Sequence, residues 1–215
     1  HHKKLKIGAL YGNRFELLLR EVTNISALET RWQTIIETGV PNYFGEQRFG
    51  IGGGNIDKAH AIFSGKKVRD KIKRGMYLSA ARSLIFNNVI SQRIAQQYFD
   101  QLMPGDVLML AGTQSVFIVD EVDNKLKQRL ASFDVDITAP LWGAGELMTQ
   151  GEPKLFEQMV AEQHNEFCQG LAKFGLKQER RRTRLSMSQA SINVNADKKT
   201  VQLNFYLPAG CYATT

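Results

Sequence analysis

Alternating apolar and polar residues near both ends of the chain constrain its fold most strongly. Near the C-terminus, a period-two pattern surrounds a polar turn at 195–198 and predicts a hairpin with one solvated face. Its apolar positions are Ile192, Val194, Val201, Leu203, Phe205 and Leu207. Near the N-terminus, residues 5–10 and 15–22 are predicted strands joined by a turn at 11–14. Strands at both ends predict one sheet, formed by residues 1–38 and 185–215 and interrupted by an inserted domain at 39–184.

The segment between these strands is rich in helical patterns. Ser26 and Glu29 form a predicted capping box for a first helix, which Gly39 and Pro41 terminate. Helices are also predicted over 56–63, 78–102, 124–132 and 153–174, a hairpin over 106–111 and 115–119, and a strand or loop through 139–141. The predicted buried stripe of the last helix is Phe156, Met159, Gln163, Phe167, Leu171 and Phe174, and Gly175 caps it. The predicted fold class is therefore α+β, with an inserted α/β domain in a mixed, mainly antiparallel sheet.

Positive charge is concentrated in two short segments. The 215 residues carry a net charge of +7, from 28 Lys and Arg against 21 Asp and Glu. Segment 65–75 has six cations and one acid, and segment 177–184 has five cations and one acid, so together they carry +9 and the rest of the chain −2. Focused charge of this kind favours a polyanionic partner, because phosphate contacts release counterions. The alternative for each segment is a solvated loop. The candidate phosphate-binding residues are Lys66, Lys67, Arg69, Lys71, Lys73, Arg74, Arg180, Arg181 and Arg182.

No motif indicates a cofactor, a nucleotide-binding loop or a metal site. A dinucleotide-binding glycine pattern would need glycine at position 55, which is Asn55, and Gly65 is not part of a phosphate-binding loop signature. His60 and His164 are isolated, and the two cysteines lie 43 positions apart. No apolar run reaches the roughly 20 residues that cross a bilayer. The sequence therefore predicts a protein of the reducing cytoplasm with no cofactor, no metal and no membrane partner.

Segment 42–50 places three aromatic residues and an arginine beside several glycines. Tyr43, Phe44 and Phe49 could stack on bases, and Arg48 could bind phosphate. The alternative is a compact loop whose aromatic residues pack onto the protein core.

The same segment carries a resemblance to a known family. VPNYFG at 40–45 and QRFG at 47–50 resemble the signature of the TruD family of tRNA pseudouridine synthases. Three further motifs agree with the family in order along the chain: LYGNRF at 10–15, LSAARS at 78–83 and LPAGCYAT at 207–214. Four separate motifs in one order are far more specific than any single motif.

The resemblance implies a cofactor-free isomerase that converts a uridine of tRNA, usually position thirteen, into pseudouridine. In the family, an aspartate acts at the ribose C1′ side, and the uracil detaches, turns and rejoins through C5. Asn13 and Phe15 fall on the family's Gly-Asn-x-Phe motif, where the ring stacks on the target base and the amide orients the pocket. Tyr212 falls where the family has an aromatic residue lining the substrate site. Arg48 lies in the family's hallmark segment without an assigned role.

The family's catalytic aspartate precedes the Gly-Asn-x-Phe motif in a Gly-x-Lys-Asp-Lys type segment, and this chain has only twelve residues before Asn13. No aspartate of the chain has that context. We therefore expect a fragment, or the ordered part, of a longer enzyme, with the catalytic aspartate upstream of His1 and the 215-residue chain inactive alone. The expected core is part of a pseudouridine synthase sheet, the expected partner is tRNA, and the expected state is a monomer. The alternative function is a noncatalytic RNA-binding module.

Overall fold

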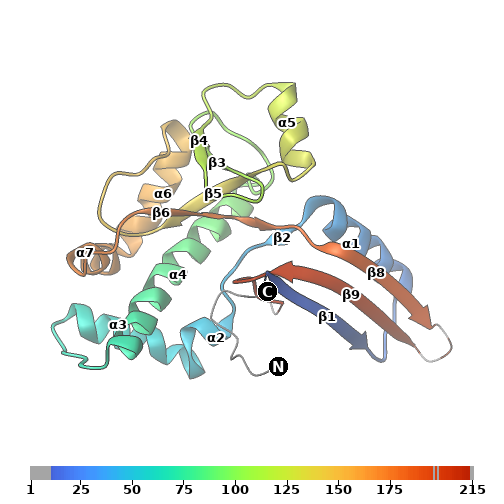
Figure 1. Ribbon diagram of the computed structural model, residues 1–215, viewed down its shortest axis with the longest axis horizontal. Coiled ribbons are helices and arrows are strands. Elements are labelled where there is room, and N and C mark those ends of the chain that lie inside the picture. Colours follow the sequence, from blue (N-terminus) through green and yellow to red (C-terminus); the bar gives the residue numbers. More distant parts are fainter. Residues whose placement is uncertain (1–10, 196, 198, 214–215) are drawn as a thin grey trace, which may run out of the picture. The chain divides into compact units, whose positions relative to one another are not determined.

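The computed structural model describes residues 11–195, 197 and 199–213. The chain divides into two compact units: unit 1 is His1–Asn42 with Arg184–Thr215, and unit 2 is Tyr43–Thr183. Both units combine helices with antiparallel strand pairs (Figure 1), so the predicted α+β class is confirmed. The strand predicted over 5–10 lies outside the described residues.

Unit 1 contains a three-stranded antiparallel sheet with a helix on one face. The strand order is β1 (Gly12–Leu19), β9 (Thr200–Pro208) and β8 (Ser188–Asn195). Helix α1 (Ile25–Thr38) buries Trp32 against Phe205 and the other alternating apolar residues of β9. A short pair, β2 (Val40–Pro41) with β7 (Arg184–Leu185), also belongs to this unit. The predicted C-terminal hairpin is therefore present, and its apolar face forms the core.

Two local predictions in unit 1 are wrong. Residues 12–14 are the start of strand β1, and Gly12 pairs with Pro208 instead of lying in a turn. A Cβ atom at Gly12 would collide with the carbonyl oxygen of Leu207 and the hydroxyl of Tyr206, so glycine here permits close strand approach. Helix α1 is capped by Asn24, whose side chain accepts a hydrogen bond from the Ala27 amide at 3.0 Å, and Ser26 lies inside the helix.

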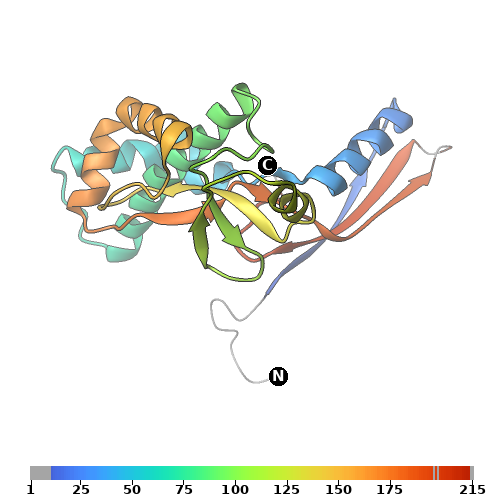
Figure 2. The ribbon, with the colours of Figure 1, turned by 90° about the horizontal axis from the view of Figure 1, so that it is seen from above.

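Unit 2 is built on a four-stranded antiparallel sheet. The strand order is β4 (Val116–Ile118), β3 (Val107–Leu110), β5 (Val135–Leu141) and β6 (Glu179–Arg182). Strands β3 and β4 form the predicted hairpin. Residues 139–141, for which the sequence predicts either a strand or a loop, belong to strand β5. Figure 2 shows helix α5 (Asn124–Ala131), yellow-green and seen nearly end-on, beside the yellow strand β5. Leu130 of α5 belongs to an apolar cluster with residues of β3 and β5.

The central helix of unit 2 is α4 (Lys71–Ala95), preceded by α2 (Glu46–Phe49), the 3₁₀ helix η1 (Ile51–Gly53) and α3 (Gly54–Phe63). The predicted bounds of this helix, 78–102, are wrong at both ends, because the helix begins and ends seven residues earlier. It starts earlier because Asp70 caps it, accepting hydrogen bonds from the amides of Ile72 and Lys73. It ends earlier because Gln97 adopts a positive φ of 62°. Of the apolar residues at i, i+4 spacing along this helix, Ala81, Ile85, Phe86, Val89 and Ile90 are buried, whereas Ile94, which the spacing also places on the buried face, is exposed.

The long helix predicted over 153–174 is two helices, α6 (Gly151–Gln163) and α7 (Asn165–Lys173). His164 leaves helical geometry at φ −119° and ψ 30°, and its Nε2 lies 2.5 Å from the side-chain nitrogen of Asn88 on α4. The predicted buried stripe does not hold across this break. Phe156, Phe167 and Leu171 are buried, whereas Met159 and Phe174 are exposed.

Candidate nucleic-acid interface

The first basic segment forms the connection between α3 and α4 and the first turns of α4. Its six cations, Lys66, Lys67, Arg69, Lys71, Lys73 and Arg74, are called the basic cluster below. Gly65 has φ 99°, which turns the chain after α3, and Asp70 then starts α4. The segment is therefore half loop and half helix, and not the loop that the sequence predicts. Five of the six cationic residues are exposed and Arg74 is half-buried.

The charge of the basic cluster is not neutralised within the described part of the chain. Across residues 11–195, 197 and 199–213, none of its six side chains forms an ion pair or a side-chain hydrogen bond. The acid within the segment, Asp70, is engaged with two backbone amides of its own helix. A surface with this excess of positive charge attracts polyanions strongly at low ionic strength.

A groove of about 360 Å³ lies beside the basic cluster. Four members of the cluster line it: Lys66, Lys67, Arg69 and Arg74. Ile62 and Val68 supply apolar surface, and Phe174, the residue that follows α7, also lines the groove. The fold thus adds an aromatic ring to a segment whose sequence contains none.

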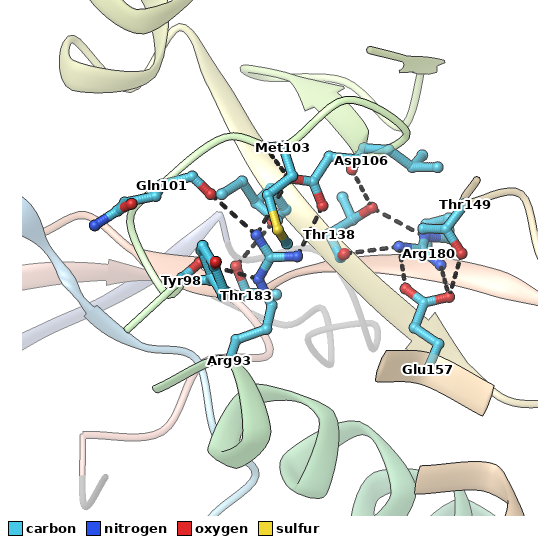
Figure 3. A network of polar contacts seen from close by, with 12 residues as sticks. Arg93, Tyr98, Gln101, Met103, Asp106, Thr138, Thr149, Glu157, Arg180 and Thr183 are labelled. Carbon is cyan, nitrogen blue, oxygen red and sulfur yellow. Dashed lines mark hydrogen bonds and ion pairs between the residues drawn. The ribbon is translucent and has the colours of Figure 1, made fainter. Parts of the chain in front are cut away.

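The second basic segment has a different environment, in strand β6. The guanidinium of Arg180 is only 4% exposed and forms bonds of 2.8 and 3.0 Å with the two carboxylate oxygens of Glu157 (Figure 3). It also donates to the carbonyl and hydroxyl of Thr138, and Thr149 donates to the same glutamate. All three guanidinium nitrogens of Arg180 therefore donate hydrogen bonds within unit 2, and an RNA contact of Arg180 stays a prediction.

The neighbouring arginines of β6 are engaged as well. Arg181 lies over the ring of Phe44, with its guanidinium carbon 4.3 Å from the ring centre. Arg182 donates to the carbonyl of Leu110 at 2.6 Å and lies 3.7 Å from the carboxylate of Asp136. The two basic segments, which look alike in sequence, thus differ in their contacts: the arginines of β6 contact residues of other strands, helices and loops of unit 2.

The aromatic segment 42–50 packs onto α4. Asn87 of α4 bonds both backbone groups of Phe44, at 2.9 and 3.0 Å, and Phe44 is buried against Phe86. The Tyr43 hydroxyl lies 3.0 Å from the Ser91 hydroxyl. Arg48 donates to the Ser79 hydroxyl at 2.9 Å. The alternative of a loop plugged onto the core therefore describes Tyr43 and Phe44 better than a base-stacking surface does.

The motif LSAARS has a structural explanation in α4. Arg82 donates to three backbone carbonyls, those of Leu141, Trp142 and Lys177, and pairs with Glu179 at 3.1 Å. These bonds join α4 to the ends of β5 and β6. Ala80 and Ala81, which precede Arg82, are completely buried. The sequence offered no signal for this role, because the partners are backbone groups distant in the chain.

Two residues implied for the substrate pocket lie together in unit 1. Asn13 and Phe15 occupy the same face of β1, opposite Leu207 and Phe205 of β9. Asn13 is exposed, whereas Phe15 is half-buried and stacks on Phe205 with ring centres 5.4 Å apart. Tyr212 is half-buried beyond the end of β9, between Cys211 and Ala213, which both pack on the unit 1 core. Because Gly12 pairs with Pro208, Asn13 lies at this same end of the sheet.

The described residues offer little support for a metal site or a reactive cysteine. No group of three or more His, Cys, Asp or Glu side chains among them could hold a metal ion. Burial raises the pKa of the Cys168 thiol to about 12, which keeps it protonated and unreactive. Several aspartates have structural partners: Asp106 and Asp134 pair with arginines, and Asp70 and Asp123 cap helices. In the part of the chain that is described, no helix is both long and apolar enough to cross a bilayer.

The whole chain is similar to proteins of one family. The model of the family tRNA pseudouridine synthase D (TruD) matches residues 1–57 and 55–215. The tRNA pseudouridine synthase D of Colwellia psychrerythraea is 63% identical over 223 residues, and that of Aeromonas hydrophila is 46% identical over 215 residues. These alignments cover 100% of this chain but 61% and 60% of the relatives. The chain therefore spans less than two thirds of their length.

A solved structure supports the fold. The crystal structure of a TruD protein from Methanosarcina mazei superposes with a TM-score of 0.71 at 20% sequence identity. The superposition covers 99% of this chain and 69% of the other.

Proposed function

Because the chain belongs to the TruD family of tRNA pseudouridine synthases, we propose that the protein it represents converts a uridine of tRNA, at position thirteen, into pseudouridine. The observation that carries this proposal is the 63% identity to a tRNA pseudouridine synthase D along the full chain. The unneutralised basic cluster supports tRNA as the substrate, because it supplies phosphate-binding charge.

We assign the chemistry to unit 1 and backbone binding to unit 2. Asn13, Phe15 and Tyr212 would line the pocket of the target uridine, with Phe15 held in place by its stacking on Phe205. The nucleophilic aspartate would lie in the part of the relatives that this chain does not span. Residues 39–184 would form the family-specific insertion that binds the body of the tRNA.

The function is tested by incubating unmodified tRNA with the protein at the full length of its relatives and mapping pseudouridine chemically. We expect conversion at position thirteen, and none with the 215-residue chain alone, because orientation without the nucleophile cannot cleave the glycosidic bond. Asn13→Ala in the longer protein should slow conversion roughly tenfold or more by misplacing the base. Its melting temperature should stay unchanged, since Asn13 is exposed. Tight tRNA binding without conversion by the longer protein would favour the noncatalytic RNA-binding module instead.

The basic cluster should control affinity for tRNA and leave the chemical step alone. Lys66→Ala/Lys67→Ala is expected to weaken binding to all tRNAs alike, because phosphate contacts carry little sequence information. Each lost contact should make the slope of log affinity against log salt shallower by about 0.7–0.9. The matched control is Lys125→Ala/Lys127→Ala, which removes the same charge from two exposed positions of α5.

Binding is measured by titrating labelled tRNA at several salt concentrations, and the chemical step by single-turnover conversion at saturating protein. The single-turnover rate should stay close to that of the unaltered protein. Equal affinities and equal salt slopes for the two double variants would show that the basic cluster is only a solvated surface.

A further inference from the structure

Phe174 is a large aromatic side chain in an unusual place. It is 43% exposed and lies in the groove lined by Lys66, Lys67, Arg69 and Arg74. The sequence pattern predicts it to be buried in a helix stripe. Instead, α7 ends at Lys173, and Gly175, with φ 76°, turns the chain away and leaves the ring at the groove.

The Phe174 ring packs against other aromatic side chains on one side. Phe63 of α3 lies against Gly170 of α7 so closely that a Cβ atom on this glycine would collide with its ring. Phe63 also contacts Phe167 and Phe174, with ring centres 5.6 and 6.1 Å apart. Phe174 is therefore supported by an aromatic cluster on one side, while the remaining surface of its ring is available in the groove.

A groove lined by cationic side chains and one aromatic ring can bind both parts of a single nucleotide, its phosphate and its base. Ammonium and guanidinium groups bind a phosphate, and the face of a phenylalanine ring stacks on a nucleobase. The volume of about 360 Å³ lies at the small end of the range for ligand pockets. Bases within a duplex are already stacked on their neighbours, so an aromatic side chain of this kind selects an unpaired base.

We propose that this groove binds one unpaired nucleotide of the tRNA, with its phosphate on the basic cluster and its base stacked on Phe174. The proposal rests on the function proposed above, which makes tRNA the partner. It differs in assigning unit 2 a base contact in addition to backbone contacts. All residues that line the groove belong to unit 2, whereas Asn13, Phe15 and Tyr212 belong to unit 1.

The test compares two probes that differ only in the presence of bases. One is a short single-stranded oligouridylate, and the other is an abasic oligomer with the same number of phosphates. Phe174→Ala should weaken binding of oligouridylate and of tRNA on the order of tenfold, the usual effect of removing one stacking partner. It should leave binding of the abasic oligomer unchanged. Lys66→Ala/Lys67→Ala should weaken binding of oligouridylate, of the abasic oligomer and of tRNA.

Two further variants separate stacking from folding and from apolar contact. Phe174→Trp should retain the affinity for oligouridylate, and the fluorescence of the new indole should be quenched when the oligomer binds. Phe174→Leu keeps an apolar side chain of similar size but should bind as poorly as Phe174→Ala. Melting temperatures of all variants should stay close to that of the unaltered protein, because the ring is partly exposed.

The outcomes distinguish this inference from the proposed function. If tRNA binds in a lysine-dependent manner but Phe174→Ala binds oligouridylate normally, the base contact is wrong and the proposed function stands. If Phe174→Ala weakens the abasic probe equally, the residue acts through the shape of the groove and the stacking proposal is wrong. If tRNA does not bind at all, both proposals fail together.

Discussion

Asp106→Ala is expected to lower the free energy of unfolding by about 3–5 kcal/mol, because it leaves a buried guanidinium without its counter-charge. The side chains of Arg93 and Asp106 are 3% and 1% exposed, and they form two bonds of 2.7 and 3.2 Å (Figure 3). The same carboxylate accepts a hydrogen bond from the Met103 amide at 2.9 Å. A loss of this size is a large part of the roughly 5–15 kcal/mol that stabilises a typical domain.

The position of the pair in the chain explains its importance. Arg93 lies in the last turn of α4 and also donates to the carbonyls of Tyr98 and Gln101, while Asp106 directly precedes β3. The pair therefore fixes the path by which the chain leaves the central helix and enters the sheet of unit 2. Breaking it should loosen this connection as well as expose a buried charge.

Urea unfolding followed by circular dichroism measures the effect. The matched control is Asp120→Ala, which removes a carboxylate from an exposed position just after β4 and should change stability by less than about 0.5 kcal/mol. Similar losses for the two variants would show that the Arg93–Asp106 pair contributes no more than a surface charge.

The strand and core pattern could be predicted from the sequence because it depends on local periodicity. Val201, Leu203 and Phe205 alternate with polar residues and are buried in the structure as predicted. The stripe Ile85–Val89 was likewise recognisable, although the helix bounds were not. The start of α4 was missed because its first residues are basic rather than apolar, and the signal that mattered was the cap Asp70. At the break between α6 and α7, His164 contacts Asn88, a residue 76 positions away, and no local pattern encodes that contact.

The candidate site could also be predicted only in part, because its charges are visible in the local sequence but their partners are distant in the chain. Counting charges identified two basic segments, but whether a cation is free depends on acids elsewhere in the chain. Glu157 precedes Arg180 by 23 positions and is on a different element, so no local pattern indicates that the two side chains are paired. The sequence pattern predicts Phe174 to be buried because the helical period continues through His164. Its place beside Lys66 follows from the packing of α3 on α7, which is a tertiary contact.

Glu157→Ala is the second variant with a large expected effect, a loss of about 3–5 kcal/mol in the free energy of unfolding. It leaves the Arg180 guanidinium, 4% exposed, without its carboxylate partner, and it removes the acceptor of the Thr149 hydroxyl. The double variant Glu157→Gln/Arg180→Met removes both charges and keeps a side-chain oxygen for Thr149. It should be more stable than Glu157→Ala, because no unpaired charge remains buried.

The same double variant decides between the two readings of the second basic segment. If Arg180 serves only to join β6 to α6, tRNA affinity and its salt dependence should be unchanged once folding is secured, whereas Lys66→Ala/Lys67→Ala still weakens binding. Urea unfolding gives the stability of each variant, and titration with labelled tRNA gives its affinity. A double variant that unfolds like the unaltered protein yet loses tRNA affinity would return Arg180 to the RNA-binding surface. The expected result instead excludes Arg180 from that surface, because its side chain is 4% exposed and already donates to Glu157 and Thr138.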